Sequence, residues 1–351
     1  MAKKKRLFDL AQTKGEFQIR GNASGVLKNG FFTAKKTKNN SDMNLCNFGV
    51  KFDEGQTEYI TLNGTAGRSV YYYNKAENQT KEVAWKDRTK VPGEGYRLIG
   101  INVGLETIED ENGKVVNDNK MFADFDAAKY VSEHLKDDMP IYIKGSLEFN
   151  SYTKPNGEVV RKHRLIPNQI SLCSKPIDFE AEDFKVLADF KTTICYQGID
   201  KERDEAGKET GRFVLDALYI GYSTIENTTF IVEDSKLAGL FKKNLKPNTA
   251  IEVTGCFKNF IDVTAEDETD DWGQKSSFDR INKPVRLEMI ITGAKPGTID
   301  TEAYDEDSIA EARRAIANKE QVEANYGEKK ETVAAEADWG MSTEDDDNEP
   351  W

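Results

Sequence analysis

Histidine is nearly absent from the sequence, which contains only His134 and His163 among its 351 residues. Neither belongs to an HExxH motif or to a pair with cysteine, so zinc chemistry and histidine-based nucleophilic triads are poorly supported. Residues 64–69 contain glycines but lack the lysine and the spacing of a phosphate-binding loop. Asp270 and Asp271 fit a polar loop tip better than a metal site. We therefore expect a protein that is not an enzyme and needs no cofactor or metal.

Paired cysteines and long apolar runs are missing as well. The four cysteines form no CxxC motif, and we expect them to be reduced, small buried side chains in a cytoplasmic protein. The basic residues 1–6 are followed by no apolar stretch, which argues against a secretory signal. No run reaches the roughly 18 apolar residues that a membrane span requires.

Acidic charge is unevenly distributed along the chain. Residues 300–351 carry 17 Asp and Glu against 5 Lys and Arg, a net charge of −12, whereas the whole chain carries −13. Residues 1–100 carry 18 basic and 10 acidic side chains, a net charge of +8. Such asymmetry indicates a surface that binds polyanions and a self-repelling tail, although a solvated surface with a solubility tail is equally compatible with charge alone.

Short segments rich in Val, Ile, Tyr, Phe and Thr, separated by Gly, Asn and Asp, predict a mainly β protein. After residue 321 the chain is polar and acidic, with too few large apolar residues to fold. The expected divisions are a basic N-terminal arm at 1–13, a first domain at 14–180 with an insertion near 63–95, a second domain at 181–300, a short helix or linker at 301–321, and a disordered acidic tail at 322–351.

An internal repeat relates the two predicted domains. At an offset of 110 residues, Ala128 aligns with Ala238 and Gly145 with Gly255, inside a shared order of helix, polar loop and strand. A helix before the fourth strand of such a unit is typical of the OB-fold, a five-stranded Greek-key barrel. The repeat therefore predicts two tandem OB-like barrels with one short helix each; a pair of unrelated β-sandwiches is the alternative.

Single-stranded nucleic acid requires cations for its phosphates and flat side chains for its bases. Residues 68–97 combine the two, and strand alternation places Tyr71 and Tyr73 opposite Tyr72, so these rings are divided between surface and core. The predicted hairpin near residues 149–164 is one wall of the groove in an OB barrel. The candidate DNA-binding residues are Lys35, Lys36, Lys38, Arg68, Tyr71, Tyr72, Tyr73, Lys75, Trp85, Lys86, Arg88, Phe149, Tyr152, Lys154, Arg161, Lys162 and Arg164.

The last eight residues, 344–351, form an acidic segment that closes with an aromatic ring. A terminal indole next to an acid run suits a partner pocket with an apolar hole and a cationic rim. We expect Asp345, Asp346, Asp347, Pro350 and Trp351 to dock on another protein.

This ending resembles that of bacterial and phage single-stranded-DNA-binding proteins, in which OB domains precede a flexible linker and an Asp-rich tip closing in Pro-Phe. Asn348-Glu349 and the terminal Trp depart from the commonest form, and two covalently joined barrels resemble a divergent phage version. The resemblance implies coating of single-stranded DNA during replication and recombination in a bacterial host, with a polymerase, helicase or primase recruited by the tip.

Three alternatives remain open from the sequence. One is a structural β-rich phage protein, such as a tail or capsid component, with an acidic solubility tail. Another is a nuclease or annealing factor with accessory OB units. A DNA mimic is the third, and the +8 balance of residues 1–100 disfavours it.

Overall fold

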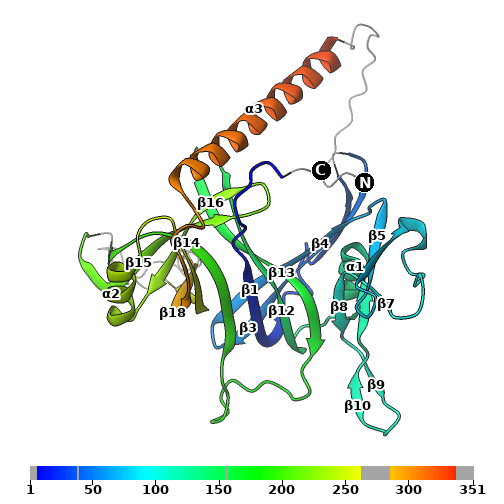
Figure 1. Ribbon diagram of the computed structural model, residues 1–351. Coiled ribbons are helices and arrows are strands. Elements are labelled where there is room, and N and C mark those ends of the chain that lie inside the picture. The colour runs from blue at the N-terminus through cyan, green and yellow to red at the C-terminus, as the bar shows by residue number, and fades with distance from the viewer. Residues whose placement is uncertain are drawn as a thin grey trace, which may run out of the picture.

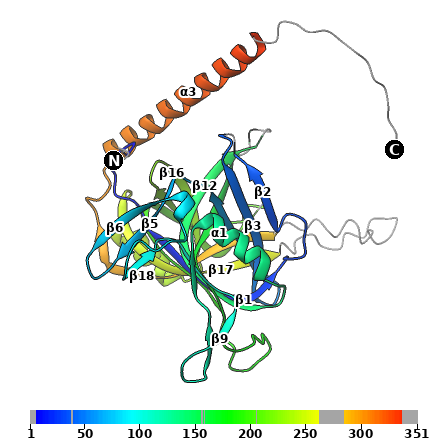
Figure 2. The same ribbon diagram turned by 90° about the vertical axis from the view of Figure 1, so that its right-hand side faces the viewer.

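The computed structural model describes residues 6–37, 39–154, 157, 159–204, 206–261 and 285–336. The described chain is mainly β, as the sequence predicts, and most of its strands belong to one continuous sheet. Figures 1 and 2 show this β-rich body with one long helix extending away from it.

The second half of the chain closes a five-stranded barrel. Its strands are β14 (Leu187–Arg203), β15 (Glu209–Ile220), β16 (Ile225–Val232), β17 (Thr249–Ile261) and β18 (Val285–Asp300), and α2 (Ser235–Asn244) precedes β17. The strands pair antiparallel in the order β16-β15-β14-β17-β18, and β18 returns parallel to β16. This circuit, with a helix between the third and fourth strands, is the OB topology, and the prediction of OB-like barrels is confirmed.

The first half repeats this circuit with a divided third strand. Its strands are β1 (Gly15–Ser24), β3 (Asp42–Asp53), β4 (Gln56–Thr65), β8 (Ile101–Gly104), β12 (Pro140–Thr153) and β13 (Val159–Leu172), and α1 (Asp124–His134) lies before β12. The order β4-β3-β1-β12-β13 is antiparallel throughout, and β8 pairs parallel with β13. The third-strand position is therefore filled by β4 and β8 together.

The two glycines of the sequence repeat occupy equivalent bulges. The register of β12 against β13 shifts between Lys144 and Gly145, and that of β17 against β18 shifts between Thr254 and Gly255. A Cβ atom at either glycine would overlap the backbone carbonyl of the facing strand. Because only glycine allows this close approach, the repeat preserves it in both barrels.

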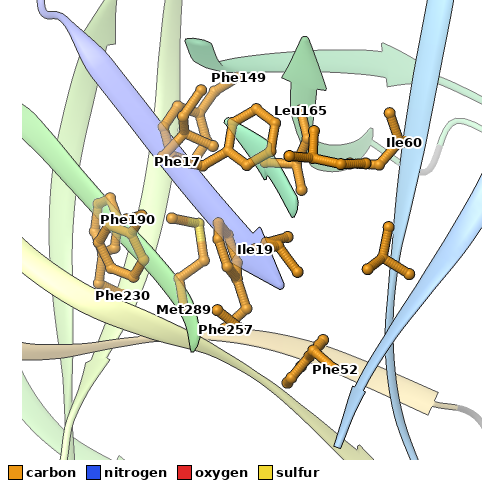
Figure 3. Close-up of a cluster of buried hydrophobic side chains, with 14 of the residues drawn as sticks. Phe17, Ile19, Phe52, Ile60, Phe149, Leu165, Phe190, Phe230, Phe257 and Met289 are labelled. Carbon is orange, nitrogen blue, oxygen red and sulfur yellow. The ribbon is translucent and has the colours of Figure 1, made fainter. Parts of the chain in front are cut away.

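The barrels are joined along their first strands. Strands β1 and β14 pair antiparallel, with Phe17 opposite Phe190. One hydrophobic cluster runs through both barrels, and its side chains from the two halves lie next to each other in Figure 3. Phe149 of the first barrel packs on Tyr219 and Phe230 of the second, at ring distances of 5.3 and 5.8 Å. The two barrels therefore share a core.

The segment between β4 and β8 forms a separate three-stranded sheet beside α1 (Figure 1). It consists of β5 (Ser69–Asn74), β6 (Gln79–Ala84), the one-turn helix η1 (Trp85–Asp87) and β7 (Tyr96–Leu98). Its inner face buries Val70, Tyr72 and Tyr96. The remaining short strands of the first half are β2 (Phe32–Lys36), β9 (Thr107–Glu109), β10 (Val115–Asn117) and β11 (Lys120–Phe122).

The long helix α3 (Glu306–Glu336) starts on the second barrel and projects into solvent (Figures 1 and 2). Tyr304, Ile309 and Ala312 pack with Leu10 of the N-terminal segment and Ile220 of β15. The helix continues fifteen residues beyond the expected end at 321, into the expected disordered tail. The sequence from 306 to 336 has no proline and is rich in Ala, Glu and Lys, which favour helix. Within the described residues, the helices are either too short or too polar to pass through a lipid bilayer.

Candidate nucleic-acid interface

The hairpin formed by β12 and β13 of the first barrel reaches across to the second barrel. Ser151 at its outer end donates a hydrogen bond to the carboxylate of Glu226 on β16, with an Oγ–Oε2 distance of 2.6 Å. Reciprocally, Asn259 on β17 donates its side-chain amide to the carbonyl of Thr57 on β4 at 2.7 Å. Each barrel therefore holds the long hairpin of the other against its third strand.

A hollow of about 720 Å³ lies between these reciprocal contacts, lined by β4, β12 and β13 of the first barrel and by β16 and β18 of the second. We call it the inter-barrel groove. Its lining includes Tyr59, Thr61, Arg161, Lys162, Arg164, Asn227 and Thr229.

The available charge of the groove is cationic. Arg161 and Lys162 are exposed on β13, and Arg164 is half-buried beside them. Two carboxylates also line the hollow, but both are buried and engaged. Glu58 lies 3.1 Å from His163 Nε2, and Glu288 accepts from Arg212 at 2.8 Å. Phosphates entering the groove would therefore meet Lys162 and Arg164, together with Arg161, which also interacts with the exposed carboxylate of Asp216 on β15.

One exposed aromatic ring lines this groove, and a second lies near its cation Lys162. Tyr59 on β4 is 62% exposed, and Tyr152 near the end of β12 is 47% exposed, with Lys162 Nζ 5.8 Å from its ring centre. The OB-fold binds oligonucleotides on its second and third strands and its 1–2 and 4–5 connections, which is where Tyr59 and this hairpin lie. Exposed rings among cations can stack unpaired bases.

Sequence reasoning missed Tyr59. The signal was present, because Glu58, Ile60 and Leu62 are buried and alternate with Tyr59 and Thr61 along β4. A period of two places Tyr59 on the outer face once the inner face is known. Because Tyr59 has no lysine or arginine next to it in the sequence, it was not predicted as a binding residue.

Two predicted binding residues lie in the core instead. Phe149 is buried between the barrels, where it contacts Tyr219 and Phe230. Tyr72 is 3% exposed, and its hydroxyl donates to the carbonyl of Arg88 at 2.7 Å. Burial also raises the pKa of Tyr72. Because neither ring is accessible, both are corrected from binding residues to packing residues.

Arg88 and Trp85 connect the inserted sheet to α1. Arg88 makes a two-pronged ion pair with Asp126, at 2.6 Å from Nε and 2.9 Å from Nη2, and this carboxylate raises the pKa of Arg88. The Arg88 guanidinium also lies 4.6 Å from the Trp85 ring centre, and Trp85 meets Phe125 edge-on at 5.8 Å. Asp126 therefore engages the charge of Arg88, whereas Trp85 is half-buried, and a role of these two residues in DNA binding stays a prediction.

The remaining candidates are spread over other surfaces. Lys35 and Lys36 are exposed on β2, where Lys36 pairs with Asp42 at 3.1 Å. Lys154 is half-buried just beyond β12. The inserted sheet exposes a further group, Arg68, Tyr71, Tyr73, Lys75 and Lys86. Lys38 and the docking residues Asp345, Asp346, Asp347, Pro350 and Trp351 lie outside the described residues.

The second barrel presents a different outer surface. Asp200 and Asp216 are exposed on β14 and β15, and burial together with Asp200 raises the pKa of Asp216. Arg212 is held by Glu202 and Glu288, both at most 5% exposed. Across the described residues, no group of three or more His, Cys, Asp and Glu is arranged to hold a metal ion. The described basic groove therefore belongs mainly to the first barrel.

Comparisons with known proteins place the chain in a family. Two solved structures of the single-stranded DNA binding protein from Thermus aquaticus resemble it: a deletion mutant, with a TM-score of 0.37 over 82% of this chain and 95% of that one, and the wild-type protein, with 0.36 over 81% and 93%. Both are 11% identical, and values this low support no conclusion about function. No curated protein sequence matches the chain significantly. The family model YorF matches residues 74–333, which include β8, β12 and β13 of the first barrel, the whole second barrel and most of α3, and the chain therefore belongs to the YorF family.

Proposed function

We propose that the chain binds single-stranded DNA without sequence preference, and that the inter-barrel groove is its main contact surface. The observation that carries this proposal is the placement of Arg161, Lys162 and Arg164 beside exposed Tyr59, at the hairpin and third strand of an OB barrel. The function is one of binding, with no chemical step and no cofactor.

Each part of the groove has a physical role in this proposal. The three cations neutralise phosphates and release counterions, which makes binding strong at low salt and weak at high salt. Tyr59 and Tyr152 stack unpaired bases, each stack contributing about 1–3 kcal/mol regardless of base identity. Asn227 and Thr229 on β16 line the groove with polar groups that accept or donate hydrogen bonds without requiring one base.

A salt titration with a fluorescent oligo-dT tests the proposal. We expect anisotropy to rise at low salt, and log affinity to fall against log salt with a slope of roughly −2 for three phosphate contacts on a single strand. Unchanged anisotropy at low salt would show that the groove does not bind DNA. Cleavage or modification of the oligonucleotide would contradict a pure binding role.

The acidic segment 344–351 is assigned the recruitment of replication or recombination proteins, supported by its acid run and Trp351. In this proposal the protein works on DNA in the cytoplasm of a bacterial host. Removing residues 344–351 should leave oligo-dT affinity equal or higher and abolish capture of a purified partner polymerase, helicase or primase. Loss of the folded state on truncation would contradict a docking role for the segment.

A further inference from the structure

The inserted sheet carries exposed rings that its own folding does not require. Its inner face buries Val70, Tyr72 and Tyr96, which supply the small core. Its outer face exposes Tyr71 at 45% and Tyr73 at 36%. Large aromatic side chains left on the solvent face of a strand contribute little to stability there, so they are available for a ligand.

The neighbouring strand completes this face. Arg97 on β7 pairs directly with Tyr73, and Ile99 donates its backbone N–H to the carbonyl of Tyr71 at 2.8 Å. Directly paired residues of an antiparallel sheet point to the same side, so Arg97 and the 57% exposed Ile99 lie beside the tyrosines. We call Tyr71, Tyr73, Arg97 and Ile99 the tyrosine platform.

A hollow of about 1220 Å³ adjoins the platform, between the inserted sheet and strands β8 and β11. Tyr73, Arg97 and Ile99 line it, together with Lys75 and the exposed Met121. Buried Tyr72 and the Arg88–Asp126 ion pair also line this hollow and Tyr71 does not, so the hollow borders one edge of the platform and its one carboxylate is already paired.

The charge of the inserted segment favours an anionic ligand. Residues 66–98 hold seven Lys and Arg against four Asp and Glu. Arg88 and Lys90 are paired with Asp126 and Asp87, whereas Lys75 and Arg97 are exposed and meet no carboxylate within the described part of the chain. Cations next to exposed rings are the combination that single-stranded nucleic acid requires.

Strand β4 leads along the chain from the inter-barrel groove to the inserted sheet. Tyr59 of β4 lines the groove, the strand runs on to Thr65, and the inserted sheet starts at Ser69. Six residues of strand cover about 20 Å. A DNA strand that leaves the groove along β4 arrives at the inserted sheet.

We propose that the tyrosine platform is a second contact site for the same DNA strand, resting on the proposed function of the groove. One unstacked base lies on the ring of Tyr73 or Tyr71, with Ile99 and Met121 beside it. Lys75 and Arg97 contact the neighbouring phosphates. Long strands then engage groove and platform together, whereas short strands engage the groove alone.

A length series of oligo-dT tests this inference with the double variant Tyr71→Ala/Tyr73→Ala. An oligonucleotide of roughly 8 nucleotides, within the site size of one OB domain, should bind variant and wild type equally. One of roughly 30 nucleotides should bind the variant about ten-fold more weakly, the equivalent of one lost stack. The matched control Tyr71→Phe/Tyr73→Phe keeps both rings and should bind both lengths like wild type.

A second variant, Lys75→Ala/Arg97→Ala, leaves every ring of the sheet in place, so it tests the inference without the risk that loss of a ring misfolds the sheet. It should lower the salt slope for the long oligonucleotide by about 1.4, roughly 0.7 for each lost phosphate contact. Unchanged affinity and slope for the long oligonucleotide in both variants would overturn the inference and leave the platform to a protein partner. Failure of wild type to bind either length would instead refute the proposed function itself.

Discussion

Tyr71, Tyr72 and Tyr73 are consecutive residues with two different environments. Strand alternation predicts that they are divided between two faces, but the sequence does not say which face is outside. In the structure Tyr72 is the inward-facing residue, and its hydroxyl donates to the Arg88 carbonyl. Tyr71 and Tyr73 lie on the exposed face. Tyr73 also donates its hydroxyl to Asn78 Oδ1 at 3.0 Å, so what distinguishes Tyr71 and Tyr73 from Tyr72 is the exposure of their rings.

At the level of single residues, the double variant Arg161→Ala/Lys162→Ala should weaken oligo-dT binding. Both side chains are exposed in the inter-barrel groove, so their removal costs affinity with little effect on stability. We expect affinity at low salt to fall roughly ten-fold, and the salt slope to shrink by about 1.4. The measurement is fluorescence anisotropy across a salt series.

Lys242→Ala/Lys243→Ala is the matched control for this charge change. Both lysines are exposed on α2 of the second barrel, so the variant has the same net charge as the groove variant. Equal losses of affinity in the two variants would show that overall charge, and not the groove, determines binding.

Buried thiols give a residue-scale prediction about pH. Burial raises the pKa of Cys46 and Cys195 to about 12, whereas a free thiol ionises near about 8.5. The stabilisation from keeping these thiols protonated is complete below about pH 8.5 and is lost as the pH rises towards about 12. Denaturant midpoints should therefore fall across this alkaline range.

Thiol labelling at pH 8 checks the same environment. In the folded protein the partly exposed Cys173 and Cys256 should react first, and Cys46 and Cys195 only after unfolding. Labelling of Cys46 in the native state as fast as that of Cys173 would contradict the burial of its thiol.

At the scale of helices and strands, the sequence repeat predicted those features that depend on residues close together in the chain. Gly145 and Gly255 repeat at a fixed offset because each sits at a bulge of its own hairpin, and the helices before them repeat for the same reason. The pairing of β1 with β14 joins segments about 170 residues apart and has no local signal. The packing of Phe149 against the second barrel depends on that pairing, so the sequence alone could not predict it.

The link between the inserted sheet and α1 predicts local unfolding. Arg88 and Asp126 are each about three-quarters buried and paired by two hydrogen bonds, so Asp126→Asn should loosen the sheet by about 1.5–3 kcal/mol. Hydrogen exchange should speed up in residues 69–98 and stay unchanged in the barrels. The control Glu133→Gln removes an exposed 3.9 Å ion pair on the same helix. It should change neither the stability of the inserted sheet nor its rate of hydrogen exchange. Faster exchange throughout the chain would contradict a local role.

Across the whole molecule, two copies of one fold have unequal surfaces. The first barrel contributes Arg161, Lys162 and Arg164 to the groove, and the second exposes Asp200 and Asp216. Both are needed to build the groove, because β16 and β18 form its second wall. In the proposed function, the second barrel supports the barrel that contacts DNA, and the shared core fixes their relative position.

The shared core predicts that the barrels unfold together. Phe149 starts in the first barrel and fills space between Tyr219 and Phe230 of the second, so Phe149→Ala leaves a cavity that belongs to both. We expect a loss of about 3–5 kcal/mol in the free energy of unfolding. Wild type and variant should each show one denaturant transition, with the variant midpoint lower and the slope unchanged. Leu240→Ala, at a 57% exposed position on α2, should leave the midpoint nearly unchanged. Two separate transitions in wild type would mean that the barrels are independent, and the groove between them would then have no fixed shape in which to hold a DNA strand.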